Sequence, residues 1–344
     1  MLKLHSYGKI NLFLDIEGRL QNGYHLIRSV MQSVDIYDEV VLNSLDENKI
    51  IIECSDISIP VNEKNTCYKA ALLLKEALCI NSGIHIYINK RIPAEAGLAG
   101  GSGNAAAVIK GLNVMWKLNL SEEEMCSFGM QIGSDIPFCL TGGTCLAEGI
   151  GDKVTELNDF SWNDILIIKP EFSMSTAFVY KNLEPQNYNL YKNNRILEYI
   201  SLNDYENAGL SVENTLEKVV EKFHPEINGI KKLMLDNGAI SSVMTGSGSA
   251  IFALFKDTVS LNKAYQIAVK IYPDTFMTKT VADGTTMDIS YLKKISLKES
   301  RTFIKFLCLE HSERNDTYYE KNINFNYVSI VDCRMLSQWQ RCCT

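Results

Sequence analysis

Four glycines stand within seven residues of the sequence, at Gly97, Gly100, Gly101 and Gly103, and an alanine-rich stretch follows at once. Glycine loses more backbone entropy on folding than any other residue, and an ordinary surface turn needs only one or two glycines. A loop of bare amides beside the start of a helix can instead hold an anion, because unpaired N–H groups and the helix dipole favour negative charge there. The stretch therefore predicts an anion site, with phosphate as the first candidate.

The elements that must position this loop are predicted from periodicity and turn residues. Apolar and polar residues alternate over 9–16, which predicts a strand with Lys9 and Asn11 on the face opposite its aliphatic side chains. Asn22–Gly23 is typical of a turn. The other elements expected around the glycine loop are strands over 37–44, 48–55 and 83–90, a helix over 65–78, a helix beginning at Asn104, and paired strand segments over 136–151 around Gly142–Gly143.

The second half of the chain repeats the mixture of strands and helices. A capping box from Ser121 to Glu124 predicts a short helix that ends near Gly133. Beyond it we expect a strand over 164–170, helical stretches to about residue 235, strands within 240–255, a helix over 261–272 and a strand over 275–281. This order indicates an α+β protein with two lobes and a cleft between them. The predicted divisions are an N-terminal lobe over 1–158, a C-terminal lobe over 159–283, and an extension over 284–344 without an assigned role.

Composition and charge narrow the class of protein. The chain has 344 residues, 46% of them hydrophobic, and a formal net charge of −7. Without a basic excess to neutralise phosphates, we expect no nucleic-acid partner, and no apolar run approaches the roughly 18 residues that predict a membrane span. Ten cysteines in a chain too long for a small disulfide scaffold indicate reduced thiols in a cytoplasmic protein. No histidine or cysteine spacing predicts a metal ligand. The expected partner is a small-molecule substrate, and the expected assembly is a monomer or a homodimer.

Several common phosphate motifs are absent from the sequence. No Gly-Lys-Ser or Gly-Lys-Thr occurs, which excludes the P-loop pattern. The glycines do not have the GxGxxG spacing of a dinucleotide-binding loop. The HRD and DFG triplets of protein kinases are also missing.

The stretch PAEAGLAGGSGNAAA, over 93–107, resembles the phosphate loop of the GHMP kinases, a family of ATP-dependent small-molecule kinases. Residues 244–255 resemble the third, C-terminal glycine motif of this family, so the resemblance covers about residues 1–283 in the expected order. It implies a two-lobed fold with a ribosomal protein S5 domain 2-like N-terminal lobe and a ferredoxin-like C-terminal lobe. It also implies ATP as co-substrate and Mg²⁺. The residues implied in ATP binding are Lys90, Pro93, Gly97, Leu98, Ala99, Gly100, Gly101, Ser102, Gly103 and Asn104. Those of the third glycine motif are Thr245, Gly246, Ser247 and Gly248.

The resemblance also implies two catalytic residues. Asp135 matches the family aspartate that takes the proton from the acceptor hydroxyl, and a carboxylate suits that task if it lies within hydrogen-bond reach. Lys9 matches the lysine that pairs with this aspartate and favours its ionised form. The alternative for Asp135 is a turn or capping aspartate before Ile136–Pro137, and for Lys9 an ordinary solvated lysine on a strand. Metal ligands are not assigned, because Mg²⁺ often binds through substrate phosphates and water.

Residues 7–25 and 132–152 resemble the branch of the family whose acceptor carries a cytidine diphosphate group. The residues implied in acceptor binding are Asn11, Tyr24, His25, Asp135, Thr176 and Tyr180. Aromatic rings offer a stacking surface for cytosine, and an imidazole can hydrogen-bond the edge of the base. The alternatives are another GHMP kinase, such as a mevalonate, homoserine or galactose kinase, and a homologue that binds nucleotide without turnover.

The sequence departs from the family pattern at two positions of the glycine loop. Ala99 stands where many members have glycine, and we expect this to be tolerated if the φ angle of Ala99 is negative. Gly103 replaces a usual serine or threonine, so one hydroxyl that could contact phosphate or the magnesium shell is missing. Ser102 remains, and we expect weakened rather than abolished ATP handling.

Overall fold

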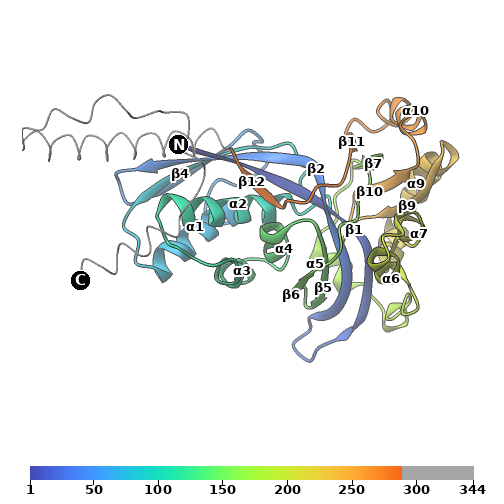
Figure 1. Ribbon diagram of the computed structural model, residues 1–344, viewed down its shortest axis with the longest axis horizontal. Helices are drawn as coiled ribbons and strands as arrows, with labels where there is room; N and C mark the ends of the chain where they lie inside the picture. Colours follow the sequence, from blue (N-terminus) through green and yellow to red (C-terminus); the bar gives the residue numbers. More distant parts are fainter. Residues whose placement is uncertain (289–344) are drawn as a thin grey trace, which may run out of the picture. The chain divides into compact units, whose positions relative to one another are not determined.

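Two long antiparallel strands open the chain, β1 (Leu2–Arg19) and β2 (His25–Leu45), in a computed structural model that describes residues 1–288. The strand predicted over 9–16 is confirmed and is longer than predicted. The pairing register shifts at three places along the hairpin, and such bulges bend a strand and increase its twist. Figure 1 shows the resulting curved hairpin, which runs from the first sheet to the second.

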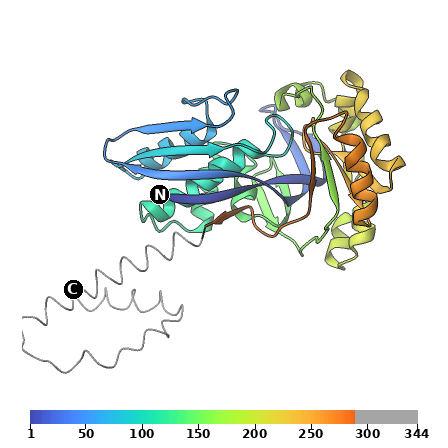
Figure 2. The same cartoon turned by 90° about the horizontal axis from the view of Figure 1, so that it is seen from above.

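The first sheet has the strand order β12-β1-β2-β4-β3, with β5 and β8 pairing β2 and β1 outside this path and β6 pairing β5. The bounds of the added strands are β3 Ile50–Cys54, β4 Gly83–Asn89, β5 Thr144–Gly149, β6 Lys153–Glu156, β8 Glu213–Asn214 and β12 Thr285–Met287. Four helices belong to this lobe, namely α1 (Thr66–Ala77), α2 (Gly100–Met115), α3 (Glu122–Met130) and α4 (Ile136–Thr141). Helix α2 packs on β1 and on α1, and Figure 2 shows the helices of this lobe against the sheet. The Lys9 amide donates to the Leu98 carbonyl at 3.1 Å, so the glycine loop before α2 lies beside β1.

Local capping explains where these helices begin. The Asn65 side chain accepts a hydrogen bond from the Cys67 amide at the start of α1. The predicted capping box of Ser121 and Glu124 is confirmed, with both reciprocal hydrogen bonds present at the start of α3. These side chains satisfy first-turn amides that would otherwise lack partners.

The prediction of paired strands over 136–151 was wrong in its first part. Residues 136–141 form helix α4, which ends at Gly142 with φ +83°, and the strand β5 begins only at Thr144. Pro137 lies in the first turn of the helix, where its missing amide donor is harmless and its fixed φ favours a helix. A six-residue apolar run shows no period that separates a buried helix from a strand.

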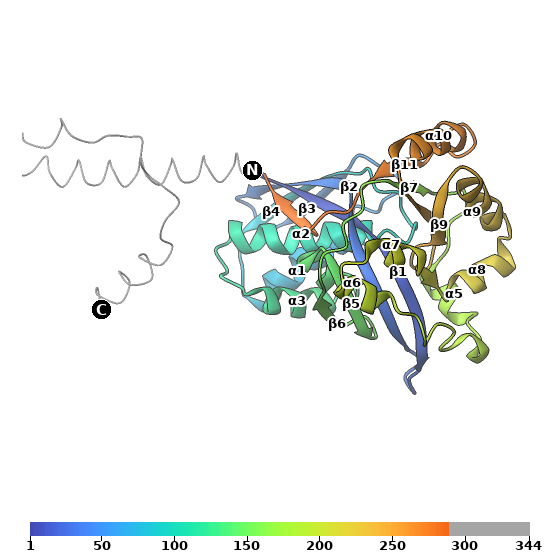
Figure 3. The same ribbon diagram turned by 45° about the vertical axis from the view of Figure 1, so that its right-hand side comes forward.

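The second sheet is four-stranded and antiparallel, in the order β11-β7-β10-β9. Its strands are β7 Ile165–Ile168, β9 Ala239–Met244, β10 Ile251–Phe255 and β11 Thr275–Thr278. Numbered by position in the chain, the strands of this sheet follow the order 4-1-3-2. Helices α9 (Glu226–Asp236) and α10 (Thr258–Ala268) pack against the sheet (Figure 3). The remaining helical elements are α5 Thr176–Lys181, η1 Pro185–Asn187, α6 Ile196–Ser201, α7 Tyr205–Leu210 and α8 Glu217–Phe223. The predicted α+β fold with a ferredoxin-like second lobe is confirmed.

Both faces of strand β7 are buried, and on each face its side chains pack with side chains of β1, so the hairpin is joined to the second lobe. Ile165 and Ile167 pack in one core cluster with Leu12 of β1, whereas Ile168 packs on the other face in a cluster that contains Ile16. The predicted boundary between 158 and 159 falls in the connection between β6 and β7 and stays a prediction. The chain crosses between the lobes again, because β12 pairs with β1 in the first sheet.

Residues 284–288 of the predicted extension are described, and they contribute β12 to the first sheet. The rest of the extension lies outside the described residues. Within residues 1–288, no helix is long and apolar enough to cross a membrane.

Candidate active site

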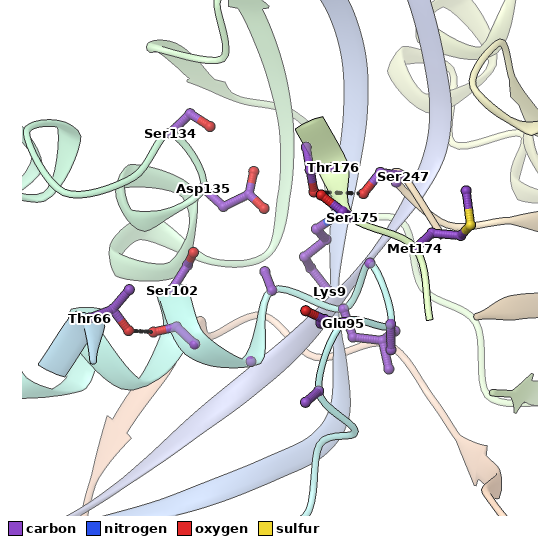
Figure 4. A pocket seen from close by; sticks show the side chains of 18 of the residues that line it. Lys9, Thr66, Glu95, Ser102, Ser134, Asp135, Met174, Ser175, Thr176 and Ser247 are labelled. Carbon is purple, nitrogen blue, oxygen red and sulfur yellow. Dashed lines mark hydrogen bonds between the residues drawn. The ribbon is translucent and has the colours of Figure 1, made fainter. Parts of the chain in front are cut away.

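A cavity of about 600 Å³ lies where the glycine loop meets β1, the start of α4, the start of α5 and the loop after β9. It is lined by many of the residues singled out in the sequence: Lys9, Asn11, Lys90, Pro93, Gly97, Leu98, Ala99, Gly100, Gly101, Ser102, Asn104, Asp135, Thr176, Tyr180, Gly246, Ser247 and Gly248. Figure 4 shows Asp135 above Ser102 on one side, with Lys9, Thr176 and Ser247 opposite them. Gly103, Tyr24, His25 and Thr245 are not among its lining residues.

Helix α2 begins at Gly100, four residues before the predicted start at Asn104. The amide of Gly103 already donates to the Ala99 carbonyl, at 2.8 Å. The amides of Gly100, Gly101 and Ser102 precede it in the first turn, where an α-helix offers no intrahelical acceptor. All three residues line the cavity. The glycines therefore form the helix terminus itself, and this terminus is suited to an anion.

Close packing explains Gly97, which has φ +75°. A Cβ at this position would collide with the Thr245 carbonyl, so only glycine lets the glycine loop approach the third glycine motif. The Ala250 amide also donates to the Ala96 carbonyl, at 3.1 Å. Two segments about 150 residues apart are thereby fixed against each other at the cavity.

The negative φ on which the expected tolerance of Ala99 depends is not present, because this residue caps α2 in the left-handed region with φ +56° and ψ +24°. A side chain in that region is strained by contact between its Cβ and the following carbonyl. The glycine common in the family at this position is explained by the same geometry. Ala99 lines the cavity directly before the three free amides, so its strain is located at the anion site.

The structure also explains Gly103. A Cβ at this position would lie 2.5 Å from the Ser6 hydroxyl and 3.3 Å from the Tyr7 carbonyl, both in β1. Position 103 thus faces the sheet rather than the cavity. A hydroxyl there would lie between the helix and β1, which makes its absence a matter of helix packing in this chain.

Lys9 and Asn11 lie in β1 with their side chains buried, not on a solvated face. Lys9 is 4% exposed, and its ammonium donates to the Asn11 Oδ1 atom at 2.6 Å. Asn11 is held in turn, because its Nδ2 donates to the Ser29 hydroxyl at 2.8 Å and its amide donates to the Thr245 hydroxyl at 3.0 Å. Burial lowers the pKa of Lys9, and the negative charge of Asp135 partly opposes this shift.

Asp135 is the N-cap residue of α4, yet its side chain makes no capping hydrogen bond. Among the described residues, no hydrogen bond or ion pair engages its carboxylate, and it lines the cavity. The capping alternative therefore does not account for this aspartate. Lys9 and Asp135 face the same cavity without a direct ion pair, and their interaction is the longer-range attraction between opposite charges.

The Lys90 side chain packs beside Gly100 of the glycine loop and is held there by the protein. Its ammonium lies 2.7 Å from the Asp38 carboxylate and also donates to the Ile92 carbonyl, while Asp38 accepts from the Arg91 and Ile92 amides. A Cβ at Gly100 would lie 2.8 Å from this ammonium. The predicted contact between Lys90 and ATP stays a prediction, because the ammonium is engaged by the protein itself.

At the other end of the cavity, α5 and the third glycine motif meet through the Thr176 and Ser247 hydroxyls, 2.9 Å apart. Tyr180 of the same helix lines the cavity and contacts His25, with ring centroids 5.3 Å apart. His25 is buried, and its Nε2 atom has no hydrogen-bond partner among the described residues. Tyr24 lies at the turn of the hairpin and is 61% exposed.

Sequence reasoning missed several lining residues, among them Thr66, Ser134, Met174 and Ser175. Thr66 begins α1, and its hydroxyl donates to the Gly101 carbonyl at 2.8 Å. Asn65 is a residue type that favours the N-cap, so it could have indicated a helix start at Thr66, but the closeness of that start to the glycine loop depends on the fold. Met174 and Ser175 lie in a loop without a motif of their own.

Two protein-family models match parts of the chain that form this cavity. Residues 65–143 match the family described as GHMP kinases N terminal domain, and residues 196–274 match GHMP kinases C terminal. The first match contains the glycine loop and Asp135, and the second contains the third glycine motif.

Relatives of known name match most of the chain. The 4-diphosphocytidyl-2-C-methyl-D-erythritol kinase of Clostridioides difficile is 40% identical over 285 residues, which are 82% of this chain and 96% of that protein. The kinase of the same name from Caldicellulosiruptor bescii is 41% identical over 83% of this chain and 99% of its own length. Among solved structures, a 4-(cytidine 5'-diphospho)-2C-methyl-D-erythritol kinase matches with a TM-score of 0.69, 25% identity, and coverage of 81% of this chain and 98% of that one. A homoserine kinase from Cytophaga hutchinsonii has the same TM-score at 22% identity, covering 83% of this chain and 97% of that one, and shows the fold alone.

Proposed function

Because this chain belongs to the GHMP kinase family, we propose that it transfers the terminal phosphoryl group of ATP to the 2-hydroxyl of 4-diphosphocytidyl-2-C-methyl-D-erythritol, giving the 2-phosphate and ADP. Relatives about 40% identical over nearly their whole length carry this proposal, since their names state this acceptor. The reaction is a step in the synthesis of isoprenoid precursors without mevalonate. A cytoplasmic location, a monomer or homodimer, and the lack of a nucleic-acid partner belong to the same proposal. Six unpaired cysteines among the described residues support the cytoplasmic location. The net charge of −7 supports the lack of a nucleic-acid partner.

Phosphoryl transfer depends mainly on positioning and charge stabilisation rather than on covalent chemistry. The free amides at the start of α2 are suited to hold the phosphates of ATP, as donors fixed before the reaction begins. Asp135 accepts the proton of the acceptor hydroxyl. The oxygen of that hydroxyl forms a bond to the terminal phosphorus of ATP, and the bond from this phosphorus to the ADP oxygen breaks. The buried Lys9 cation stabilises the negative charge of Asp135 and of the transferring group.

Magnesium belongs to this proposal as the partner of ATP. No cluster of three acidic, histidine or cysteine side chains that could hold a metal occurs in residues 1–288. The oxygen donors that fit beside the phosphates are the Ser102 hydroxyl and the Asn104 Oδ1 atom, which is buried and has no hydrogen-bond partner in the described part of the chain. Neutral oxygen donors suit an ion that keeps several waters and binds mainly to phosphate. When bound, the ion neutralises phosphate charge.

His25 and Tyr180 support a cytidine-bearing acceptor. Tyr180 lines the cavity and offers an aromatic face to the base. His25 lies behind Tyr180 and outside the lining residues, and its unpartnered Nε2 atom is the group proposed to reach the edge of the base. Burial and the positive charge of Arg19 lower the pKa of His25 below its ordinary 6.5, so the ring is neutral near pH 7.

We expect the KM for the cytidylyl acceptor to rise as the pH falls below 6.5, whereas the KM for ATP stays constant over this range. The sign follows from the lowered pKa of His25, because the fold disfavours the charged ring and protonation displaces it from its buried place. Steady-state kinetics between pH 5 and 8 measure this effect. The acid rise in KM should vanish in His25→Gln, and its persistence there would assign the titration to another group.

The proposal is tested by ADP release with a panel of acceptors: the cytidylyl erythritol, mevalonate and homoserine. Equal TM-scores for the cytidylyl kinase and a homoserine kinase make this panel necessary, because fold alone does not choose the acceptor. We expect turnover with the cytidylyl acceptor only. Turnover with mevalonate or homoserine alone would refute the acceptor, and tight ATP binding without turnover of any acceptor would favour a non-catalytic homologue.

A further inference from the structure

The loop that carries the third glycine motif is fixed from behind by Asn214, which is 2% exposed and lies in the short strand β8. Its Nδ2 group donates to the Met244 carbonyl at 2.7 Å and to the Gly246 carbonyl at 2.8 Å. Its Oδ1 atom accepts from the Leu216 amide at 2.9 Å. A primary amide has two donor hydrogens and an acceptor oxygen, and here each of them has a backbone partner.

Glu217 secures the same loop one turn later. Its Oε2 atom accepts from the Met244 amide at 2.7 Å, and its Oε1 atom pairs with the Lys231 ammonium of α9. Asn214 and Glu217 together, called the loop clamp below, therefore hold backbone groups on both sides of Thr245. Strand β8 pairs with β1 at Leu14, so the clamp is anchored to the strand that carries Lys9.

Thr245 connects the clamped loop to the reaction centre. Its hydroxyl accepts from the Asn11 amide at 3.0 Å and lies 3.3 Å from Asn11 Oδ1, the atom that accepts from the Lys9 ammonium at 2.6 Å. Gly246 passes so near that a Cβ on it would lie 3.0 Å from the same ammonium. A displacement of this loop therefore moves Asn11 Oδ1, which accepts the hydrogen bond from the Lys9 ammonium, and also changes the room that Gly246 leaves for that ammonium.

We propose that Asn214 is a positioning residue for phosphoryl transfer, which holds the Lys9 ammonium in place through the 244–246 loop, Thr245 and Asn11. The inference rests on the role of Lys9 in the proposed function, and it assigns no contact between Asn214 and substrate. Neither aspartate nor alanine satisfies the partners of Asn214. Aspartate would set a carboxylate against two carbonyl oxygens, and alanine would leave three buried backbone groups without partners.

The principal test is Asn214→Ala in the full chain. We expect kcat to fall by about 10- to 100-fold and the KM values of ATP and acceptor to change by less than about threefold, the pattern of a loss felt in the transition state. The alkaline limb of the kcat profile should also move to lower pH, because a loosened Asn11 accepts less well from the Lys9 cation. Asp135 is the group whose charge acts on Lys9, and the nearby Cys139 thiol stays neutral because burial raises its pKa; both residues stay in place in the variant.

A readout without turnover keeps this test separate from the proposed function. Titration of ¹³C-labelled lysine side chains by NMR, with the Lys9 signal assigned by its loss in Lys9→Met, should show a lower pKa for Lys9 in Asn214→Ala than in the unmodified protein. The matched control is Asn113→Ala, which removes an amide that likewise binds backbone groups of one residue, Leu120, away from the cavity. It should leave kcat and the Lys9 titration unchanged.

Thr245→Val supplies a second variant of nearly unchanged volume, for the case that Asn214→Ala fails to fold. It removes the hydroxyl that links the loop to Asn11 and should move the Lys9 titration in the same direction. If Asn214 acts through Thr245, the double variant should lose no more activity than the more damaging single variant. An unmoved Lys9 titration in either variant, or fully additive losses, would overturn the inference. An unmodified protein inactive on every acceptor would instead refute the proposed function.

Discussion

Replacing Asp135 with asparagine is expected to lower kcat by about 10²- to 10⁴-fold, the usual contribution of a positioned general base. The amide has nearly the shape of the carboxylate but accepts no proton. Among residues 1–288, no hydrogen bond of the Asp135 side chain holds α4, and the first turn of this helix is secured by the backbone, with the Cys139 amide donating to the Asp135 carbonyl at 3.0 Å. The melting temperature should therefore change little, with the lost attraction between Asp135 and the Lys9 cation as its main cause, and the affinity for ATP should not fall. Steady-state kinetics and calorimetry measure the two effects.

Asp152→Asn is the matched control for this variant. Asp152 is an acidic residue close to the cavity, and its carboxylate accepts from the Ile150 amide at a turn, an acceptor role that asparagine keeps. Its kcat should match that of the unmodified protein. An Asp135→Asn enzyme that turns over within threefold of the unmodified rate would remove Asp135 from the mechanism.

Replacing Lys9 with methionine is expected to lower kcat by about 10²- to 10³-fold, since a cation that acts on developing charge in a buried site carries a large part of the catalysis. The same change should not lower the melting temperature and should raise it near neutral pH. A buried cation costs desolvation energy, and an apolar side chain of similar volume avoids that cost. Loss of activity with equal or greater stability is the outcome that marks a functional lysine.

The pH dependence of this stability difference follows from the lowered pKa of Lys9. Between that pKa and the ordinary value near 10.5, the folded protein releases a proton that the unfolded chain still holds, so the unmodified protein becomes relatively more stable as the pH rises. The advantage of Lys9→Met should therefore shrink toward pH 10.5. Lys75→Met is the control, because Lys75 is also buried but lies away from the cavity and should leave kcat unchanged. A melting temperature lowered by several degrees in Lys9→Met would contradict this account of the buried charge.

Local features of the sequence were sufficient to predict many of the strands and helices. Alternation over 9–16 predicted β1, and the Ser121 capping box predicted the start of α3, because both depend on neighbours within a few residues. The glycine spacing at 97–103 indicated a helix start able to hold an anion, which the free amides of α2 support. Resemblance to a family supplied the partners of that loop from distant parts of the chain.

Features that depend on distant contacts were not predictable from local pattern. The sheet-facing position of Gly103 depends on packing against Ser6 and Tyr7, which lie far from it along the chain, and no local pattern predicted the left-handed φ of Ala99. Helix α4 is too short for its period to be read. Asn214 stands in a stretch without a motif, and its significance appears only when β8 pairs with β1 and places its amide under the 244–246 loop.

Identification of the product tests most directly whether this chain phosphorylates the 2-hydroxyl of a cytidylyl alcohol with ATP. The purified protein, incubated with ATP, Mg²⁺ and 4-diphosphocytidyl-2-C-methyl-D-erythritol, is examined by ³¹P NMR and mass spectrometry, with Asp135→Asn as the blank. We predict one new phosphomonoester on the 2-hydroxyl, an intact diphosphate and one ADP for each product molecule. ADP formed without a phosphorylated cytidylyl product, or an equal yield from Asp135→Asn, would contradict the account.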